Sequence, residues 1–409
     1  MLILCFLPLL TAYEIDKLII NSEYPETKTI PRINSILSFL ALKLSNIKRY
    51  TKDDLWCMDR GLGLFAGLNV LPKAAWFSSY SHRVTRKMNL SFLRSLHKLW
   101  QKNELLSETT NLDFTAVPYW GDDAHLENNW SGTRHKALAS ILAVIAHDPE
   151  SGIITCGDAD VKHKNENNIV IEFLDFYKTN NNLKYLVFDS KFTTYQNLRK
   201  LDDNDIKFVT IRRRGSKVLA ELEGLPDSAW KQIRVMTGTG KKRSLKVCEQ
   251  KIFLRDYGKE IRQVAIAGNG KIKPALIITN DAELARVDIV KKWLVEKTIS
   301  EQTHFFHLNK ISSSMVIKVD FDLTMTILAY NLYRLLAKEL PRYNHHTADK
   351  LYEKFVSNSG KITISNNSIE ILLKKKRNLP AILSAMEDFT PCEISWLHKK
   401  IEIKAASYS

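Results

Sequence analysis

Apolar residues in the first quarter of the chain recur at the three- and four-residue spacing of helices. From Met1 to about Glu108, prolines and glycines divide this pattern into short helical units, and no strong strand pattern occurs. The opening segment, Met1 to Leu10 (MLILCFLPLL), has no Lys or Arg before it and no small-residue cleavage site after it, so we expect a buried helix and not a signal peptide. The pattern therefore predicts an all-α N-terminal domain over residues 1–107.

Within this helical region, the segment from Lys73 to Lys102 has the character of a DNA-contacting unit. A serine-rich stretch precedes a helix that carries Arg83, Arg86 and Lys87, and a second apolar helix face follows. Short helices with clustered arginines are typical of helix-turn-helix DNA readers. A solvated basic face on an ordinary helical bundle explains the same residues equally well. We predict DNA contacts at these three side chains and keep the second interpretation open.

From Asn111 the apolar period changes from that of helices to that of strands. Three strands are predicted first, and a helix, a strand, a helix and a strand follow in that order. This order is typical of a ribonuclease-H-like core, so the predicted fold class is α/β, with a mixed sheet flanked by helices. The predicted strands are Leu112–Tyr119, Leu138–Ala146, Gly152–Gly157, Leu183–Phe188 and Ile206–Ile211, and the predicted helices start at Asn165, as an N-cap, and at Thr194.

The pattern changes again after the last of these strands. Residues 215–280 are basic and favour strands, which predicts a β-rich insertion before the last catalytic helix. The catalytic domain is expected over residues 108–340, and a small C-terminal basic region, with the run Lys374 to Arg377, over 341–409. The elements predicted here are helices over Ala282–Phe305 and Leu323–Leu340 and a hairpin of Lys361–Ile364 with Ile369–Leu373.

Charge narrows the class of partner. The 409 residues contain 60 Lys and Arg against 45 Asp and Glu, a formal charge of +15, which favours a polyanion such as nucleic acid. Basic enzymes without such a partner also exist. No apolar segment reaches the roughly 20 residues that a membrane-spanning helix needs, so no membrane contact is predicted. The five scattered cysteines form no close pair, which predicts reduced thiols in a cytoplasmic protein.

Three acidic residues occupy positions where phosphoryl-transfer chemistry would need them. Divalent cations that activate an attacking oxygen take carboxylate oxygens as ligands. Asp113 lies between Leu112 and Phe114 in the first strand, where burial of an unpaired carboxylate would be costly. Asp189 closes the most apolar strand, at the end where open α/β sheets bind ligands. Glu296 interrupts the apolar stripe of the helix after the insertion.

Each acid also has an ordinary structural explanation. Asp113 could pair with a basic neighbour, Asp189 could cap a helix, and Glu296 could pair with Lys292 one turn earlier. Together they occupy the elements from which a ribonuclease-H-like core directs its acids to one point, which favours catalysis. Glu301 is a rival for the third position, but it lies about 140° around the helix from Glu296, so both cannot face the site. Four further acids lie in turn-like sequence and are expected to face water or to cap helices: Asp122, Asp123, Asp158 and Asp160.

Four segments resemble DDE transposases of bacterial insertion sequences. They are LNVLPKAAWFSSYSHRV (Leu68–Val84), NLDFTAVPYWGDDAHLENNWSGTRHKALASILAVIAHDP (Asn111–Pro149), LVFDSKFTTYQNLRKL (Leu186–Leu201) and VKKWLVEKTISEQTHFFHLNKISSSMVIKVDFDLTMTILAYNLYRLL (Val290–Leu336). The resemblance implies that Asp113, Asp189 and Glu296 hold two Mg²⁺ or Mn²⁺ ions on a ribonuclease-H-like fold. It also implies double-stranded DNA as the partner, both element ends and target, a homodimer on DNA, and a location at the nucleoid in a bacterial cytoplasm.

Four more side chains are candidates for DNA contact. Lys292 beside Trp293 resembles an Arg-Trp pair common in these transposases, which would grip the DNA strand. Arg134 and Lys136 are close in the chain to Asp113 and could hold a phosphate, although a plain surface loop is an equally good interpretation.

We therefore expect a transposase that cuts the ends of a mobile element and joins them to new DNA. Two alternatives stay open at this point. One is a nuclease on the same core that cuts without joining, and the other is a decayed or repurposed transposase that binds DNA without catalysis.

Overall fold

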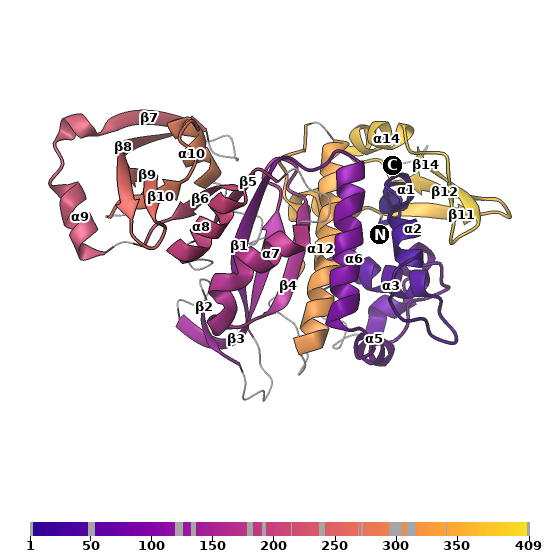
Figure 1. The fold of residues 1–409 in the computed structure, drawn as a ribbon. Coiled ribbons are helices and arrows are strands. Elements are labelled where there is room, and N and C mark those ends of the chain that lie inside the picture. Colours follow the sequence, from indigo (N-terminus) through magenta and orange to yellow (C-terminus); the bar gives the residue numbers. More distant parts are fainter. Residues whose placement is uncertain are drawn as a thin grey trace.

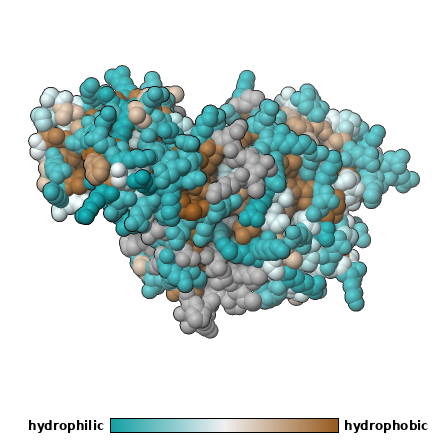
Figure 2. Space-filling view, in the orientation of Figure 1, coloured by the Kyte–Doolittle hydropathy of each residue, from teal (hydrophilic) through white to brown (hydrophobic). Residues whose placement is uncertain are grey.

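The structure is a computed structural model, and it describes residues 3–47, 54–118, 126–131, 136–177, 183–189, 194–213, 215–236, 242–268, 270, 273–293, 305–307, 316–340 and 342–406. A ten-stranded mixed sheet runs from the middle of the molecule, at β1 to β4 (residues 109–161), to its left end in Figure 1, at β7 to β10 (residues 231–279), and a second sheet of four strands lies near the carboxyl terminus. Hydrophilic side chains cover most of the described surface in the view of Figure 2. No described helix is long and apolar enough to cross a membrane.

The first half of the large sheet contains the strands expected from the apolar runs. β1 lies in its middle, antiparallel to β3 and parallel to β5, while β6 is parallel to β5 and β4 is antiparallel to β3. The predicted order of strands and helices is confirmed, with the short β2 added beside the start of β3. These strands are β1 (Thr109–Pro118), β2 (Asn128–Ser131), β3 (Lys136–His147), β4 (Ile154–Val161), β5 (Tyr185–Phe188) and β6 (Lys207–Ile211).

The basic segment after β6 extends the same sheet. It forms α9 and an antiparallel series in which β10 pairs with β6, so the sheet continues from β6 through β10, β9 and β8 to β7. Apolar residues of α10 cover one face of this extension and those of α9 cover the other. These elements are α9 (Ser216–Glu223), η5 (Asp227–Ala229), β7 (Lys231–Met236), β8 (Lys242–Leu254), β9 (Lys259–Ala267), β10 (Ala275–Thr279) and α10 (Arg286–Trp293).

Helices cover both faces of the first half of the sheet. Cys156 of β4 lines a cavity with α6 and α7, whereas a Cβ on the next residue, Gly157, would meet Ile327 of α12, so α12 covers the opposite face. α6 and α12 meet past the edge strand β4 (Figure 1). A 3-10 turn, η3 (His163–Asn168), precedes α7, so the expectation that Asn165 starts this helix was wrong. The helices are α6 (Arg86–Lys102), α7 (Ile169–Tyr177), α8 (Tyr195–Asp203) and α12 (Val316–Lys338).

The N-terminal helices share their apolar core with α12. Phe6 contacts Tyr333 edge-on at 5.0 Å between ring centroids, and the Tyr333 hydroxyl donates to the Leu44 carbonyl oxygen at 2.7 Å. Ile3 to Leu10 are buried, which confirms the buried helix predicted there. These elements are η1 (Ile3–Cys5), α1 (Phe6–Ala12), α2 (Ile15–Ile20), α3 (Arg32–Leu44), η2 (Asp54–Met58), α4 (Arg60–Phe65) and α5 (Ala74–Ser81).

The C-terminal region packs onto the same helices. The Ser395 hydroxyl donates to Asp16 at 3.0 Å, and the Trp396 indole donates to the Phe65 carbonyl oxygen at 3.1 Å. The four strands lie in the order β11-β12-β14-β13, and β11 with β12 is the predicted hairpin, which is confirmed. The elements are α13 (Ala348–Leu351), η7 (Tyr352–Val356), β11 (Gly360–Ile364), β12 (Ser368–Leu373), α14 (Leu379–Glu387), β13 (Cys392–Ile394) and β14 (Lys399–Ala405).

Candidate functional site

Asp113 and Asp189 are next to each other across two parallel strands. The last registered pair of β1 and β5 is Leu112 opposite Phe188, and the two aspartates are the next residues of each chain segment. Neighbouring strands lie about 5 Å apart, so residues 76 positions apart in the sequence (189 − 113) meet at one point. Both aspartates are exposed, and the cost of burial considered from the sequence therefore does not apply. The backbone N–H of Phe114 donates to the Asp113 carboxylate at 2.8 Å.

Lys292 lies on the sheet face that carries Asp113. Strand side chains alternate between faces, so Asp113 shares its face with Thr109, four residues earlier. The Lys292 ammonium donates to the Thr109 hydroxyl at 2.9 Å and lies 4.5 Å from the ring centroid of Tyr185, the register partner of Thr109. Burial lowers the pKa of Lys292, while nearby acids, Glu150 foremost, act in the opposite direction. The end of α10 is therefore positioned over β1 and β5.

The next residue, Trp293, joins the apolar core of the sheet extension. Its ring packs against the cluster that includes Ile289 of α10, and no described residue accepts from its buried indole N–H. The helix predicted over Ala282–Phe305 begins only at Arg286, because residues 282–284 form bends before it, and the structure describes it to Trp293. Phe305 lies in a turn, so the predicted bounds were wrong at both ends. Glu296 and Glu301 lie outside the described residues, as do Arg134, Asp122 and Asp123.

The basic residues predicted to contact DNA lie at the start of α6. Thr85 caps this helix by accepting from the Met88 N–H at 3.3 Å, and Arg83 and Lys87 are exposed on either side. Arg86 instead donates to both carboxylate oxygens of Asp158. Lys136 is exposed at the start of β3. These side chains lie on other elements than Asp113 and Asp189, and their role in DNA binding stays a prediction.

Asp158 corrects one expectation from the sequence. It lies inside β4, together with Asp160, and not in a turn. The Asp158 side chain is 13% exposed and pairs with Arg86 of α6, so it does not face open water. The residues around Asp158 resemble those of a turn, and the sequence does not show that Arg86, 72 positions away, is its partner, because only the packing of α6 brings Arg86 to β4.

Sequence reasoning missed a buried polar network beside β4. Asp320 of α12 is 4% exposed; Asn89 donates to its carboxylate at 2.6 Å, and the Ala159 N–H donates at 3.4 Å. The hydroxyl of Tyr24 donates to Asn89 at 3.1 Å. Burial raises the pKa of Asp320 to about 6. The sequence offered one signal, an acid between the apolar residues Val319 and Phe321.

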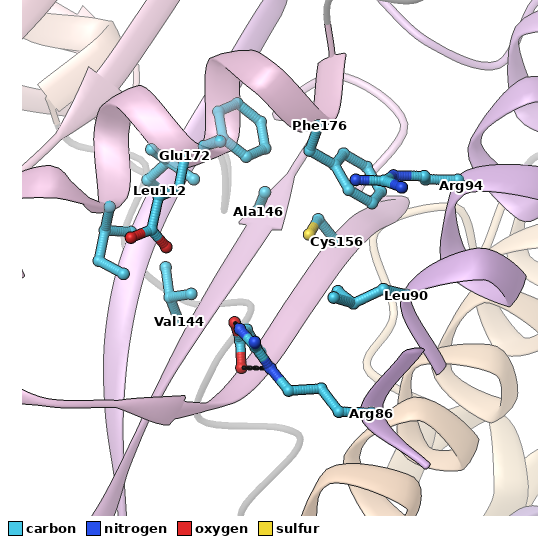
Figure 3. Close-up of a pocket in the computed structure, with 12 residues that line it drawn as sticks. Arg86, Leu90, Arg94, Leu112, Val144, Ala146, Cys156, Glu172 and Phe176 are labelled. Atoms are coloured by element: carbon cyan, nitrogen blue, oxygen red, sulfur yellow. Dashed lines mark hydrogen bonds and ion pairs between the residues drawn. The ribbon is translucent and has the colours of Figure 1, made fainter. Parts of the chain in front are cut away.

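A cavity of about 180 Å³ lies on the other face of the sheet, between α6 and α7 (Figure 3). Leu112 lines it, and because Leu112 and Asp113 point to opposite faces, the cavity is separate from the two aspartates. The Arg94 guanidinium lies 5.6 Å from the ring centroid of Phe176 at this cavity. The other lining residues are Arg86, Leu90, Val144, Ala146, Cys156, Asp158, Ile169, Glu172 and Phe173.

The donor set at Asp113 and Asp189 fits a hard divalent cation. Carboxylate oxygens are the ligands that Mg²⁺ and Mn²⁺ prefer, and two exposed carboxylates on adjacent strands can approach one ion. In the part of the chain that the structure describes, no group of three or more His, Cys, Asp or Glu side chains is placed to hold a metal.

Comparison with known proteins identifies the family. The family model described as "Transposase DDE domain" matches residues 109–332, more than half of the chain, and the chain belongs to this family. The matched region begins at β1 and includes both aspartates. Among solved structures, the piggyBac transposase in a synaptic complex with hairpin DNA is similar, with 12% identity, a TM-score of 0.48, and coverage of 85% of this chain and 78% of that one. No curated protein sequence matches the chain.

Proposed function

We propose that the chain is a transposase that cleaves DNA at the ends of a mobile element and joins those ends to target DNA. The observation that carries the proposal is the placement of Asp113 beside Asp189 on neighbouring parallel strands, within a region that matches a transposase family. The strand order β4-β3-β1-β5-β6, with β1, β5 and β6 parallel, supports a ribonuclease-H-like core. The division into domains at 107/108 and 340/341 belongs to the same proposal.

Glu296 is our candidate for the third acid. It follows Lys292 by four residues, which is the spacing of neighbours on one helix face. The contact of Lys292 with Thr109 supports this choice, because Thr109 shares its sheet face with Asp113. Glu301 lacks this relation to Lys292, since nine residues separate the two (301 − 292).

Asp113, Asp189 and Glu296 would hold two Mg²⁺ or Mn²⁺ ions. Such ions lower the pKa of water or of a DNA 3′-hydroxyl and offset charge on the leaving oxygen. The three carboxylates fix where the reacting phosphate sits. Lys292, steadied by Thr109 and Tyr185, places a positive charge beside a polyanionic strand on the same face.

The same proposal assigns the partners. Lys292 and the part of the half-buried Trp293 ring that lies outside the core contact the DNA strand at the site. Arg83, Arg86, Lys87, Arg134 and Lys136 contact phosphates of double-stranded DNA. Arg86 could do so only by exchanging its pairing with Asp158 for a phosphate. A homodimer is expected because two element ends must be handled together. The resemblance to transposases of bacterial insertion sequences adds a bacterial cytoplasmic location at the nucleoid to the proposal.

Cleavage of DNA that contains the element ends tests the proposal. The intact chain with Mn²⁺ should nick this DNA and give strand-transfer product, whereas Asp189→Ala should lose both products by about 100-fold or more, because one metal ligand is removed. Asp203→Ala, which removes an exposed carboxylate from α8, is the matched control and should retain activity. Equal activity of the intact chain and Asp189→Ala would refute the catalytic assignment. Nicking without strand transfer would favour the nuclease.

A further inference from the structure

Two basic segments of the C-terminal region, 342–354 and 374–377, are brought together at Tyr343. The Lys354 ammonium lies 5.7 Å from the ring centroid of Tyr343, and the Tyr343 hydroxyl donates to Asn378 at 3.3 Å. Asn378 directly follows the exposed run Lys374 to Arg377. We define the basic patch as Arg342, Lys350, Lys354, Lys374, Lys375, Lys376 and Arg377.

The loop that carries four of these cations is fixed in place. The Lys374 N–H donates to the Ser359 carbonyl oxygen at 3.1 Å, and Asn358 donates to the Lys374 carbonyl oxygen at 3.3 Å. Lys376 donates to the carbonyl oxygen of Ser357. The loop after β12 is therefore tied to the segment after η7, and the cations are held near one another by the fold and not only by the sequence.

Positive charge in the basic patch exceeds negative charge. The segments that form it, 342–354 and 374–377, contain seven Lys and Arg against two acids, Asp349 and Glu353. Within the described part of the chain, Arg342, Lys350, Lys354, Lys374, Lys376 and Arg377 form no ion pair with an acid. The ring of His346 contacts that of Tyr343 edge-on at 5.0 Å between centroids, so His346 lies within the positive potential of these cations. Its pKa is lowered by burial first and then by Lys354, Lys350 and His345.

We propose that the basic patch is a DNA-binding surface that holds backbone phosphates of a duplex outside the cleavage site. The excess of positive charge in the patch favours a polyanion as its partner, and the choice of DNA as that polyanion rests on the proposed function. A protein partner would need an apolar centre in the interface, and the exposed side chains of the loop Lys374 to Arg377 offer only cations.

The basic patch connects to the sheet through Arg334. Its guanidinium donates to the Asn344 carbonyl oxygen at 2.9 Å and to the Ser151 carbonyl oxygen, in the turn between β3 and β4, at 3.2 Å. That turn holds Asp148, whose carboxylate accepts from the Ser107 N–H at 2.7 Å just before β1. Hydrogen bonds therefore link the segment that carries Arg342 to the turn between β3 and β4 and, through Asp148, to the residue before β1. A duplex that lies on the Asp113 face and extends past the Thr109 end of β1 would run towards the patch.

The salt dependence of DNA binding tests this inference. The full-length chain is titrated without metal onto a fluorescent 30-base-pair duplex, about three helical turns, at several salt concentrations. The variant Lys374→Gln/Lys376→Gln/Arg377→Gln removes three charges from the patch. The matched control, Lys98→Gln/Lys200→Gln/Lys217→Gln, removes three exposed charges from α6, α8 and α9, outside the patch.

The patch variant should bind DNA at least about 10-fold more weakly than the control at moderate salt. Its plot of log affinity against log salt concentration should be less steep by about one to three units, because each lost phosphate contact lowers the slope by about 0.9. Lys374→Arg/Lys376→Arg keeps the charges and should bind like the intact chain. Equal affinity and slope for the patch variant and the control would overturn the inference.

A second measurement reads the patch at one residue. If phosphates bind there, the pKa of His346, followed by NMR, should rise when DNA is added, because the phosphates offset the field of Lys350 and Lys354. An unchanged pKa of His346 at saturating DNA would also overturn the inference. Neither measurement needs catalysis, so the inference and the proposed function can fail separately. If the chain is active but the patch variant binds DNA like the control, only the inference fails. If the patch binds DNA but the chain is inactive, only the proposed function fails.

Discussion

The buried carboxyl of Asp320 makes the stability of the chain depend on pH. Burial raises its pKa in the folded protein from 3.8 to about 6, while Asn89 and the Ala159 N–H act against this rise by donating to it. The unfolded chain exposes the carboxyl to water, where its ordinary value applies. Replacement by asparagine keeps an oxygen that can accept from Asn89 and removes the titration.

The sign and size of the effect follow from proton linkage. Between pH 4 and pH 6 the folded state holds the Asp320 proton more tightly than the unfolded state, so stability falls as pH rises through this window. A shift of about two units at 1.36 kcal/mol per unit gives a loss of about 3 kcal/mol that is complete above pH 6. Asp320→Asn should lack this loss and should be as stable as, or more stable than, the intact chain at pH 7.

Urea denaturation at pH 4.5 and pH 7 measures this difference. The free energy of unfolding of Asp320→Asn minus that of the intact chain should increase by about 2 to 3 kcal/mol from pH 4.5 to pH 7. Asp322→Asn removes a carboxylate from the same helix, one that pairs with Lys43 at 2.8 Å, and serves as the control. A pH-independent difference for Asp320→Asn would refute the reasoning.

Two further changes have defined outcomes. The ring nitrogens of His97 are buried beside Tyr177, and no described residue forms a hydrogen bond with them. Burial lowers the pKa of His97 to about 4, so stability is lost as pH falls from about 6.5 towards 4. His97→Phe should remove a loss of about 2 kcal/mol between pH 7 and pH 5, measured by urea denaturation at these two values. Gly157→Ala would place a Cβ 2.5 Å from Cδ1 of Ile327 and should destabilise the fold by about 1 to 3 kcal/mol, whereas Gly215→Ala, with open space around it, should change the melting temperature little. A pH-dependent loss that persists in His97→Phe, or equal melting temperatures of the two glycine variants, would contradict these expectations.

Sequence patterns predicted the parts of this fold that depend on local periodicity. Apolar runs predict the strands β1, β3, β4, β5 and β6, and they single out Asp113, inside the first run, and Asp189, at the end of the most apolar one. The pairing of Arg86 with Asp158 and of Asn89 with Asp320 could not be predicted, since both depend on how α6 packs between β4 and α12. The register that sets Asp113 beside Asp189 is likewise a property of the sheet, because neither strand alone specifies its neighbour.

The sequence predicts the strands of the insertion but not the sheet that they join. Alternating apolar and polar residues indicate a strand, but the pairing partner of that strand depends on residues far away in the chain. The antiparallel pairing of β10 with β6 extends the central sheet through residues 231–279, so that one face of α10 bears on the extension while Lys292 reaches β1 and β5.

Binding of Mn²⁺ to the full-length chain tests the central claim most directly, because it does not require that the DNA ends be known. We expect that Asp113→Asn, Asp189→Asn and Glu296→Gln each weaken Mn²⁺ binding by about 10-fold or more, measured by calorimetry or by the electron paramagnetic resonance of free Mn²⁺, and that Glu301→Gln leaves it unchanged. Binding by Asp189→Asn as tight as that of the intact chain would contradict the account.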